Sequence, residues 1–343
     1  MEVGVLTLHN AFNFGAYLQA YALQKALIGM GHDVEFISLS GREASMRRIR
    51  TLLSKKPSKL VFNLRKYAAF RQAWKSINVN RTSYSKTRRH YDAVVIGSDE
   101  VWNIQNPTFA MMPEYFGRGL NAKNIITYAP SSSKTTYADV AQNPLLAEGM
   151  RNIHHFSARD RNTFEIVEKI VNKPVTMVLD PTFLVEYDEE VEEAGVNSHG
   201  YVLVYTYQFD RLKIEKTRRF ARSRGLRLIS PCFYNDWCDE VVPCTPFGFL
   251  GLIRDAEYVV TDTFHGSIFS ILYGKHFGSY ASEKIKVAAL LSALGLADRE
   301  LGGVDDIGSV LDARIDYGRV RTCIEQERDV SLNYLRQALA PAG

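Results

Sequence analysis

Cysteine is scarce in this sequence of 343 residues, and its four cysteines lack the spacing of a metal site. Cys232, Cys238 and Cys244 follow one another at six-residue steps, without a C-x-x-C pair or a nearby histidine. Thiolate zinc sites have closer spacing. We therefore expect free, mostly buried cysteines, a reducing compartment and no bound metal ion.

Long apolar stretches are also missing. No run approaches the ~18 consecutive apolar residues that a membrane-spanning helix needs. Residues 1–8 have the pattern of a short strand and lack the basic region that opens a signal peptide. We expect a cytoplasmic protein.

The first strand pattern is not followed by the G-x-G-x-x-G fingerprint of dinucleotide binding. Residues 3–8 lead through a turn with Asn13 and Gly15 into a helical pattern over residues 18–27. Strand, turn and helix are the first half of a Rossmann-type unit, but one glycine before a helix is a weak phosphate signal. The pattern indicates the fold and does not imply a dinucleotide.

Acidic residues are nearly absent between residues 42 and 89, where 15 Lys or Arg stand against Glu43 alone. This segment has a net charge of +14, and the remainder, with 27 basic and 37 acidic residues, has −10. Apolar residues recur among the charges at three- and four-residue steps, which predicts amphipathic helices in a basic insertion over residues 42–90. Such helices either cover the sheet or also meet an anionic membrane surface. We favour the covering role and expect no nucleic acid, because no recognition motif accompanies the charge.

The rest of the chain alternates strand and helix patterns, and polar residues follow several strands. Asp99 comes after the strand pattern 91–96, Ser131 after 124–129 and Arg159 just after a third strand. The acidic stretch 186–193 interrupts this alternation and is the best linker in the chain. We expect two α/β domains with a cleft between them, at residues 1–185 and 198–318, followed by a helical segment at 319–343.

One further loop combines a histidine with a helix start. The strand pattern 258–260 ends at a Thr-Asp-Thr cluster, and His265 is followed by Gly266, Ser267 and an apolar helical pattern. Ligands bind beyond the carboxyl ends of parallel strands, and a helix N-terminus offers free N–H groups to an anion. The alternative is structural: Thr261 or Thr263 caps the helix and His265 bonds a backbone carbonyl.

Six motifs together resemble the polysaccharide pyruvyltransferase family. They occur in the family's order between residue 4 and about residue 296, which is nearly the whole chain. The matching segments are residues 10–24, 91–102, 128–131, 157–160, 178–182 and 261–266. The resemblance implies a glycosyltransferase-B-like fold of two Rossmann-like domains, phosphoenolpyruvate as donor and a sugar hydroxyl or diol as acceptor. It implies no cofactor beyond phosphoenolpyruvate as co-substrate.

The resemblance also suggests roles for particular residues. His265 suits proton transfer and Asp99 is its plausible partner, although Asp99 is as well suited to a turn, and Asp180 is better suited to one. We assign the donor to a set of cationic and small residues: Arg159, Lys286 with Lys284 as its substitute, Thr263, Gly266 and Ser267. We assign the acceptor to residues after the first-domain strands: Asn13, Gly15, Ser98 and Ser131. Asn13 and Gly15 alternatively shape a turn, and Arg159 alternatively pairs with Asp160.

One position departs from the family pattern. Many members carry an arginine two residues before the histidine, where this chain has Thr263. A second donor-binding cation must therefore come from elsewhere, and Arg254, Lys275 and Lys284 are the candidates.

We expect a pyruvyltransferase that forms a pyruvate ketal on a sugar of a surface-polysaccharide precursor, such as a lipid-linked capsule or exopolysaccharide unit. The basic insertion adds the expectation of peripheral contact with an anionic membrane at its inner face. The alternatives are a nucleotide-sugar-dependent glycosyltransferase on the same scaffold and a non-catalytic sugar or phosphate sensor.

Overall fold

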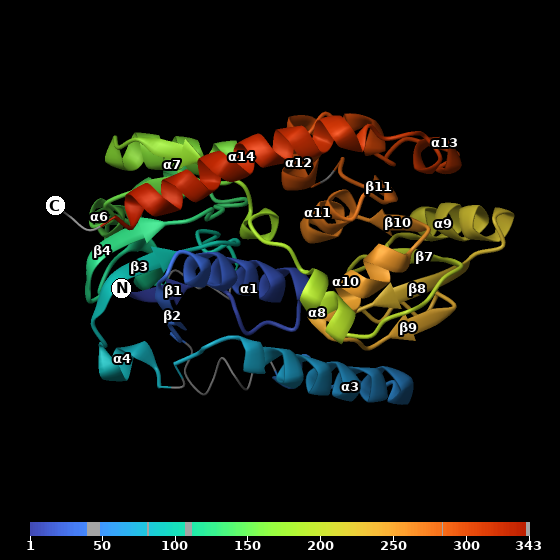
Figure 1. Cartoon of the computed structure of the whole chain (residues 1–343), viewed down its shortest axis with the longest axis horizontal. Helices are drawn as coiled ribbons and strands as arrows, with labels where there is room; N and C mark the ends of the chain where they lie inside the picture. The colour runs from blue at the N-terminus through green and yellow to red at the C-terminus, as the bar shows by residue number, and fades with distance from the viewer. Residues whose placement is uncertain (40–48, 81, 107–111, 283, 341–343) are drawn as a thin grey trace.

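The computed structural model describes residues 1–39, 49–80, 82–106, 112–282 and 284–340. Within these residues the chain forms two halves that lie side by side, each built on a parallel β-sheet (Figure 1). The α/β architecture expected from the sequence is therefore confirmed. Part of the basic insertion, including Arg42, Arg47, Arg48 and Arg81, falls outside the described residues.

The sheet of the first half has the strand order β2-β1-β3-β4 among the described residues. A bridge between Ile126 and His155 joins β4 to the β5-β6 pair, and every pairing is parallel. Its strands are β1 (Glu2–Leu6), β2 (Asp33–Phe36), β3 (Tyr91–Ile96), β4 (Ala122–Thr127), β5 (Phe156–Ala158) and β6 (Val175–Met177).

The sheet of the second half has the order β11-β10-β7-β8-β9 within the described chain, again all parallel. Its central strands are apolar and buried along their length, as expected for a parallel sheet with both faces covered. The strands are β7 (Tyr201–Tyr205), β8 (Arg227–Pro231), β9 (Glu240–Val242), β10 (Tyr258–Thr261) and β11 (His276–Ser279).

Each strand order contains one point where the chain reverses its direction of travel across the sheet. In the first sheet this point lies between β1 and β3, and in the second it lies between β7 and β10. Ligands of open α/β sheets bind at such switch points, outside the carboxyl ends of the strands. The loops after β1, β3, β7 and β10 are therefore where a site is expected.

Helices follow most of the strands. Those of the first half are α1 (Phe14–Gly29), α3 (Pro57–Ala73), α4 (Tyr84–Thr87), α5 (Tyr137–Ala141), α6 (Pro144–Arg151) and α7 (Arg161–Val171). Those that follow are α8 (Asp188–Glu193), α9 (Arg211–Ser223), α10 (Pro246–Asp255), α11 (Phe264–Leu272), α12 (Ile285–Ala293), α13 (Gly308–Leu311) and α14 (Tyr317–Ala338). No helix in the described ranges is long and apolar enough to cross a membrane.

Helix α14 runs from the second half back along the first (Figure 1). Its Tyr334 hydroxyl donates to the carbonyl of Thr127 at 2.8 Å, and its Ser331 Oγ accepts from the Leu179 N–H at 2.9 Å. The C-terminal helix thus fastens the two halves together. The domain limits at residues 185, 198 and 318 stay a prediction.

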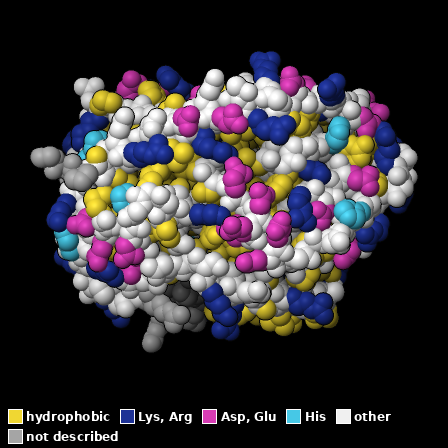
Figure 2. Space-filling view, in the orientation of Figure 1, with side chains coloured by type: hydrophobic (Ala, Val, Ile, Leu, Met, Phe, Trp, Pro, Cys, Tyr) yellow, Lys and Arg dark blue, Asp and Glu magenta, His cyan; other side chains and the backbone are white. Residues whose placement is uncertain are grey.

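Helix α3, the described core of the basic insertion, covers the junction of the halves. Its Phe70 is buried and stacks on Phe14 of α1, with ring centroids 5.5 Å apart. Near its other end Lys56 forms an ion pair with Asp236 of the second half. Its outward face leaves Val61 and Leu64 exposed, and Figure 2 shows basic and apolar side chains along this edge.

The acidic stretch expected as a linker forms helix α8 instead of an irregular segment. Glu190 of this helix accepts hydrogen bonds from Lys25 Nζ at 2.6 Å and from the Tyr21 hydroxyl at 2.5 Å, both on α1. Acidic side chains gather over α8 at the middle of the face in Figure 2. The segment that connects the halves therefore packs against the first of them.

Candidate functional site

His265 lies in the first turn of α11, directly after the β10 loop. Thr263 is the N-cap of this helix, because its Oγ1 accepts from the Gly266 N–H at 3.0 Å. Thr261 supports the cap, since its hydroxyl donates to the Tyr205 carbonyl at 2.6 Å and lies 3.0 Å from Thr263 Oγ1. The structural role that the sequence left open for both threonines is thus present.

The cap decides which N–H groups of α11 are available to a ligand. The Gly266 N–H is taken by Thr263, and the Ser267 N–H donates to the Thr263 carbonyl at 3.1 Å. The donors expected at Gly266 and Ser267 are therefore already used inside the helix. The N–H groups of Phe264 and His265 donate to no described residue, as is usual for the first helical positions.

His265 faces Asp180 of the first half, and Asp180 in turn binds Arg159. Its Nε2 lies 3.7 Å from Asp180 Oδ1, and Asp180 Oδ2 accepts a 2.5 Å hydrogen bond from Arg159 Nη1. Arg159 Nη2 also donates to Asp99 Oδ1 at 3.3 Å. The side chains of Arg159 and Asp180 are 3% and 1% exposed and that of His265 is 12% exposed, so water screens this cluster poorly.

Electrostatics keeps the buried pair charged. Burial alone raises the pKa of Asp180, but His265, Arg159 and Thr182 more than offset it and hold the pKa well below its usual range. Burial likewise disfavours the Arg159 cation, yet Asp180 and Asp99 raise its pKa above the ordinary value. Arg159 is thus matched by two carboxylates, and a protonated His265 brings these four groups to zero net charge.

Helix α1 packs its first turn against the imidazole of His265. A Cβ at Gly15 would overlap the His265 ring, so only glycine fits there. Asn13 caps α1 by accepting from the Ala16 N–H at 3.2 Å, and its amide donates to the Tyr207 hydroxyl across the junction. The structure therefore brings Asn13 and Gly15 to the site and also gives Asn13 its turn-forming role.

The two serines assigned to the acceptor are both buried. Ser98 belongs to the charged cluster, with Oγ 3.4 Å from both Asp180 Oδ2 and Arg159 Nη1. Ser131 Oγ instead accepts from the Ser133 N–H at 3.2 Å, within its own loop. In this arrangement neither hydroxyl is open to a large ligand, and their acceptor roles stay predictions.

The lysines expected to bind the donor differ in their surroundings. Lys286 reaches across the junction and pairs with Glu100. Burial works against the Glu100 carboxylate, but Lys286 and Asn103 lower its pKa to about 2. Lys284 is exposed at the start of α12, near Asp262.

The other proposed cations lie at the wrong edge of the sheet. Arg254 binds the Val196 carbonyl and Asp255 at the end of α10, and Lys275 Nζ donates to the Arg254 carbonyl just before β11. This is the amino edge of the second sheet, opposite His265. Sequence spacing therefore misplaced Arg254 and Lys275, which leaves Lys284 of the three.

Three residues of this region were not assigned to the site from the sequence. Asp180 was interpreted as a turn residue because it precedes proline, and it does accept from the Thr182 N–H at 3.1 Å. Glu100 lies within the motif segment 91–102 but received no role, and Tyr207 lies outside the six motifs, two residues after a strand. A position just after the carboxyl end of a strand is the feature that all three share with His265.

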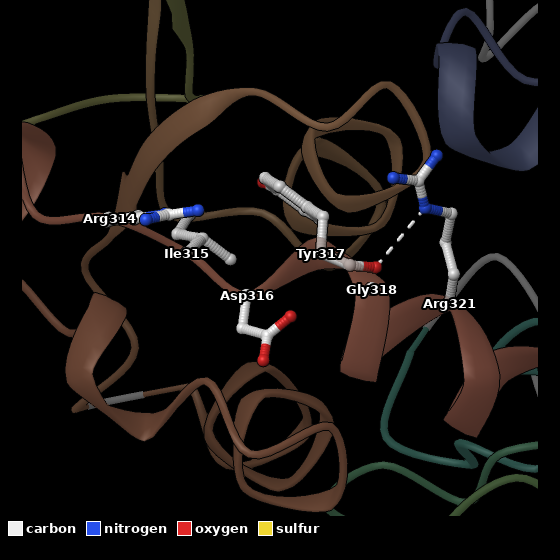
Figure 3. A pocket seen from close by; sticks show the side chains of 6 residues that line it. All are labelled: Arg314, Ile315, Asp316, Tyr317, Gly318 and Arg321. Atoms are coloured by element: carbon white, nitrogen blue, oxygen red, sulfur yellow. Dashed lines mark hydrogen bonds between the residues drawn. The ribbon is translucent and has the colours of Figure 1, made fainter.

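Two pockets open away from this cluster, at the amino edge of the second sheet. One, of about 470 Å³, is lined by residues 314–318 and Arg321, with Arg321 Nε donating to the Tyr317 carbonyl (Figure 3). The other is lined by residues 255–258 and 274–276. Gly274 follows the end of α11 and borders Tyr317, so the first pocket lies at the opposite end of that helix from His265.

The fold is similar to that of several solved structures. The UDP-GlcNAc 2-epimerase from Neisseria meningitidis bound to UDP-GlcNAc aligns with a TM-score of 0.50 and 11% identity over 100% of both chains. The UDP-GlcNAc 2-epimerase from Methanocaldococcus jannaschii gives 0.49 and 12%, over 98% of this chain and 99% of the other. The glycosyltransferase SnogD from Streptomyces nogalater gives 0.46 and 11%, over 98% and 99%. No curated protein sequence matches.

The strand order and the structural alignment define the fold class of the chain. The chain has a glycosyltransferase-B-like fold of two Rossmann-like domains, as the sequence predicted. A family model, polysaccharide pyruvyl transferase, matches residues 13–283, and the chain belongs to that family. The matched range includes the cluster of Asp99, Arg159, Asp180 and His265.

Proposed function

We propose that the protein transfers the pyruvyl group of phosphoenolpyruvate to hydroxyls of a sugar in a polysaccharide precursor, forming a pyruvate ketal and releasing phosphate. The observation that carries this proposal is the position of His265. It lies beside Asp180, which is the partner of Arg159, where the carboxyl edges of both sheets meet, in a chain of the pyruvyl transferase family.

The chemistry needs a proton donor and a proton acceptor. Protonated His265 gives its proton to C3 of the enol as the C2=C3 electron pair forms the new C–H bond. A sugar oxygen bonds to C2 and loses its proton to a carboxylate, for which Asp99 is the candidate. The C2–O bond to phosphate then breaks, its electron pair leaves with the phosphate, and the phosphate takes the proton from Asp99. A second hydroxyl bonds to C2 and returns a proton to His265, which closes the ketal.

The donor brings a phosphate and a carboxylate, so it must displace anions that are already present. Lys286 is paired with Glu100, and Arg159 is matched by two aspartates. We propose that the donor takes the place of Glu100 on Lys286 and binds the free N–H groups at the start of α11. Lys284 supplies the second donor-binding cation, which many family members provide by an arginine at the position of Thr263.

Thermal unfolding with separate ligands tests this assignment. A ligand that binds only the folded chain at about 100 times its Kd stabilises it by about 2.7 kcal/mol. We expect phosphoenolpyruvate to raise the Tm of wild type and to leave the Tm of Lys286→Gln unchanged. Protection by a nucleoside diphosphate, with none by phosphoenolpyruvate, would support a nucleotide-sugar glycosyltransferase and contradict the proposal.

We also propose a lipid-linked acceptor, because α3 presents a surface suited to an anionic bilayer. Val61 and Leu64 are exposed on the same side of this helix as Arg65 and Ala68, and Leu53 is exposed just before it. Apolar side chains among cations bind headgroups with a strength that falls as salt rises.

Sedimentation with vesicles tests the membrane contact. The wild type should sediment with phosphatidylglycerol vesicles at low salt and less at high salt. Val61→Glu/Leu64→Glu should remain soluble with the same unfolding midpoint, and equal sedimentation of both proteins would contradict the contact.

A further inference from the structure

Tyr207 is an exposed aromatic residue at the switch point of the second sheet. It follows β7 by two residues, beside the loop after β10 that carries Asp262 and His265. Its side chain is 62% exposed, whereas the neighbouring Thr206 is fully buried. An aromatic ring that serves only to join the two halves would be covered by them.

The ring is held in place although it is exposed. Phe233 lies against it, with centroids 4.2 Å apart and planes inclined at 42°. The Tyr207 hydroxyl accepts a hydrogen bond from Asn13, the N-cap of α1. A large side chain fixed at both ends loses little conformational entropy when a ligand binds.

The charges that act on the Tyr207 hydroxyl are negative. Nearby protein withdraws the hydroxyl from water and raises its pKa, and the negative charges of Asp99, Glu100 and Asp262 add to the effect. Asp262 is partly exposed, and its buried Oδ1 has no hydrogen-bond partner among the described residues. Carboxylates from both halves thus act on the Tyr207 hydroxyl.

We propose that Tyr207 is the stacking platform for the acceptor sugar and that Asp262 accepts a hydrogen bond from one of its hydroxyls. A pyranose has an apolar C–H face that fits an aromatic ring and hydroxyl donors that fit carboxylates. The donor, an anion without such a face, is repelled by the same acids. This inference rests on the proposed function, because it names where the sugar of that reaction binds.

Kinetics of phosphate release tests the platform. Tyr207→Ala should raise the acceptor KM about tenfold, which corresponds to about 1.4 kcal/mol, while the phosphoenolpyruvate KM stays within twofold. Tyr207→Phe should behave as wild type, since it keeps the ring and loses only the bond to Asn13. Tyr137→Ala, which removes an exposed tyrosine of the first half, is the matched control. An unchanged acceptor KM in Tyr207→Ala, or an equal loss in Tyr207→Phe, would overturn the proposal.

A binding measurement separates this proposal from the reaction itself. Saturation-transfer NMR with methyl galactoside, methyl glucoside and methyl mannoside should show transfer to the sugar C–H protons for wild type and Tyr137→Ala, but not for Tyr207→Ala. If phosphoenolpyruvate neither binds nor reacts but this pattern holds, the proposed function fails and the platform stands. No saturation of any of the three sugars by wild type would overturn the platform.

Discussion

At the scale of single residues, the site is a balance of buried charges. Arg159 bonds two carboxylates from different loops, and one of these, Asp180, also faces His265. Breaking one partner of a buried ion pair costs about 3–5 kcal/mol because the other charge stays buried. Asp180 thus places a carboxylate oxygen 3.7 Å from His265 Nε2, and we assign it a positioning role.

Replacing Asp180 separates these effects. Asp180→Asn should lower kcat by at least about a hundredfold, because the imidazolium loses its counter-charge, while the acceptor KM changes little. It should also lower the free energy of unfolding, measured in urea. Glu165→Gln, in an exposed pair on α7, is the control and should match wild type. A kcat near wild type in Asp180→Asn would show that His265 works without it.

The Glu100–Lys286 pair predicts a dependence of stability on pH. The pKa of Glu100 is about 2 in the folded chain against an ordinary value of 4.5, so the pair stabilises the fold above pH 4.5. This stability is lost as the pH falls from 4.5 through 2. Lys286→Gln should therefore be less stable than wild type at pH 7, and the difference should shrink below pH 4.5.

Urea unfolding at several pH values checks this prediction. Lys123→Gln, which breaks an exposed pair with Asp92, is the control and should unfold close to wild type at every pH, because water screens exposed pairs. A difference between wild type and Lys286→Gln that is the same at pH 7 and pH 3 would contradict the pairing.

Sequence reasoning reached some of these residues and missed others for a physical reason. Arg159 and His265 were found because each follows a strand within a family motif. Asp180 was underrated because an Asp-Pro pair is also a turn signal, and it serves both purposes here. The pairing of Glu100 with Lys286 joins residues 186 positions apart, and local patterns carry no information on such a contact.

At the scale of elements, α1 and α11 meet end to end at the site. Their N-caps, Asn13 and Thr263, follow β1 and β10, one strand from each half. Gly15 and the imidazole of His265 are in close contact, and the imidazole takes up the space that a Cβ at residue 15 would need. The identity of residue 15 is therefore set by the partner helix and not by its own turn.

Two glycines of α1 make this testable. The methyl group of Gly15→Ala would overlap the His265 ring, so we expect activity to fall at least about tenfold. This loss should occur although alanine is more favourable than glycine in a helix by about 1 kcal/mol. Gly29→Ala, at the other end of the same helix, has open space around it and should raise stability without changing activity. Circular dichroism and steady-state kinetics measure both. Full activity in Gly15→Ala would show that the imidazole is free to move.

Elements with a strong local pattern were predictable, and those defined by contacts were not. The strands β3, β7 and β10 follow from short apolar runs, and α14 from its helical spacing. The acidic stretch was expected as a linker because it interrupts the alternation of strands and helices, and it does lie between the two halves. The hydrogen bonds from Tyr21 and Lys25 that hold its helix α8 against α1 join residues far apart in the chain, so spacing does not show them. The covering role favoured for the basic insertion agrees with the buried side of α3.

At the scale of the whole molecule, the two sheets place their switch points face to face. Loops after β1 and β3 supply Asn13 and Asp99, and loops after β7 and β10 supply Tyr207 and His265. Helix α14 then ties the second half back to the first through Ser331 and Tyr334. The fold class was predictable from the order of strands and helices, whereas the path of α14 depends on tertiary packing that spacing does not encode.

The most direct test of the central claim is transfer itself. The protein is incubated with phosphoenolpyruvate and galactose-, glucose- or mannose-containing acceptors, including lipid-linked ones, and inorganic phosphate is measured together with product mass. We predict that phosphate release matches a mass gain of one pyruvate ketal and that His265→Ala abolishes both. Transfer of a sugar from a nucleotide-sugar by the same protein, with no pyruvyl product on any of these acceptors, would contradict the account.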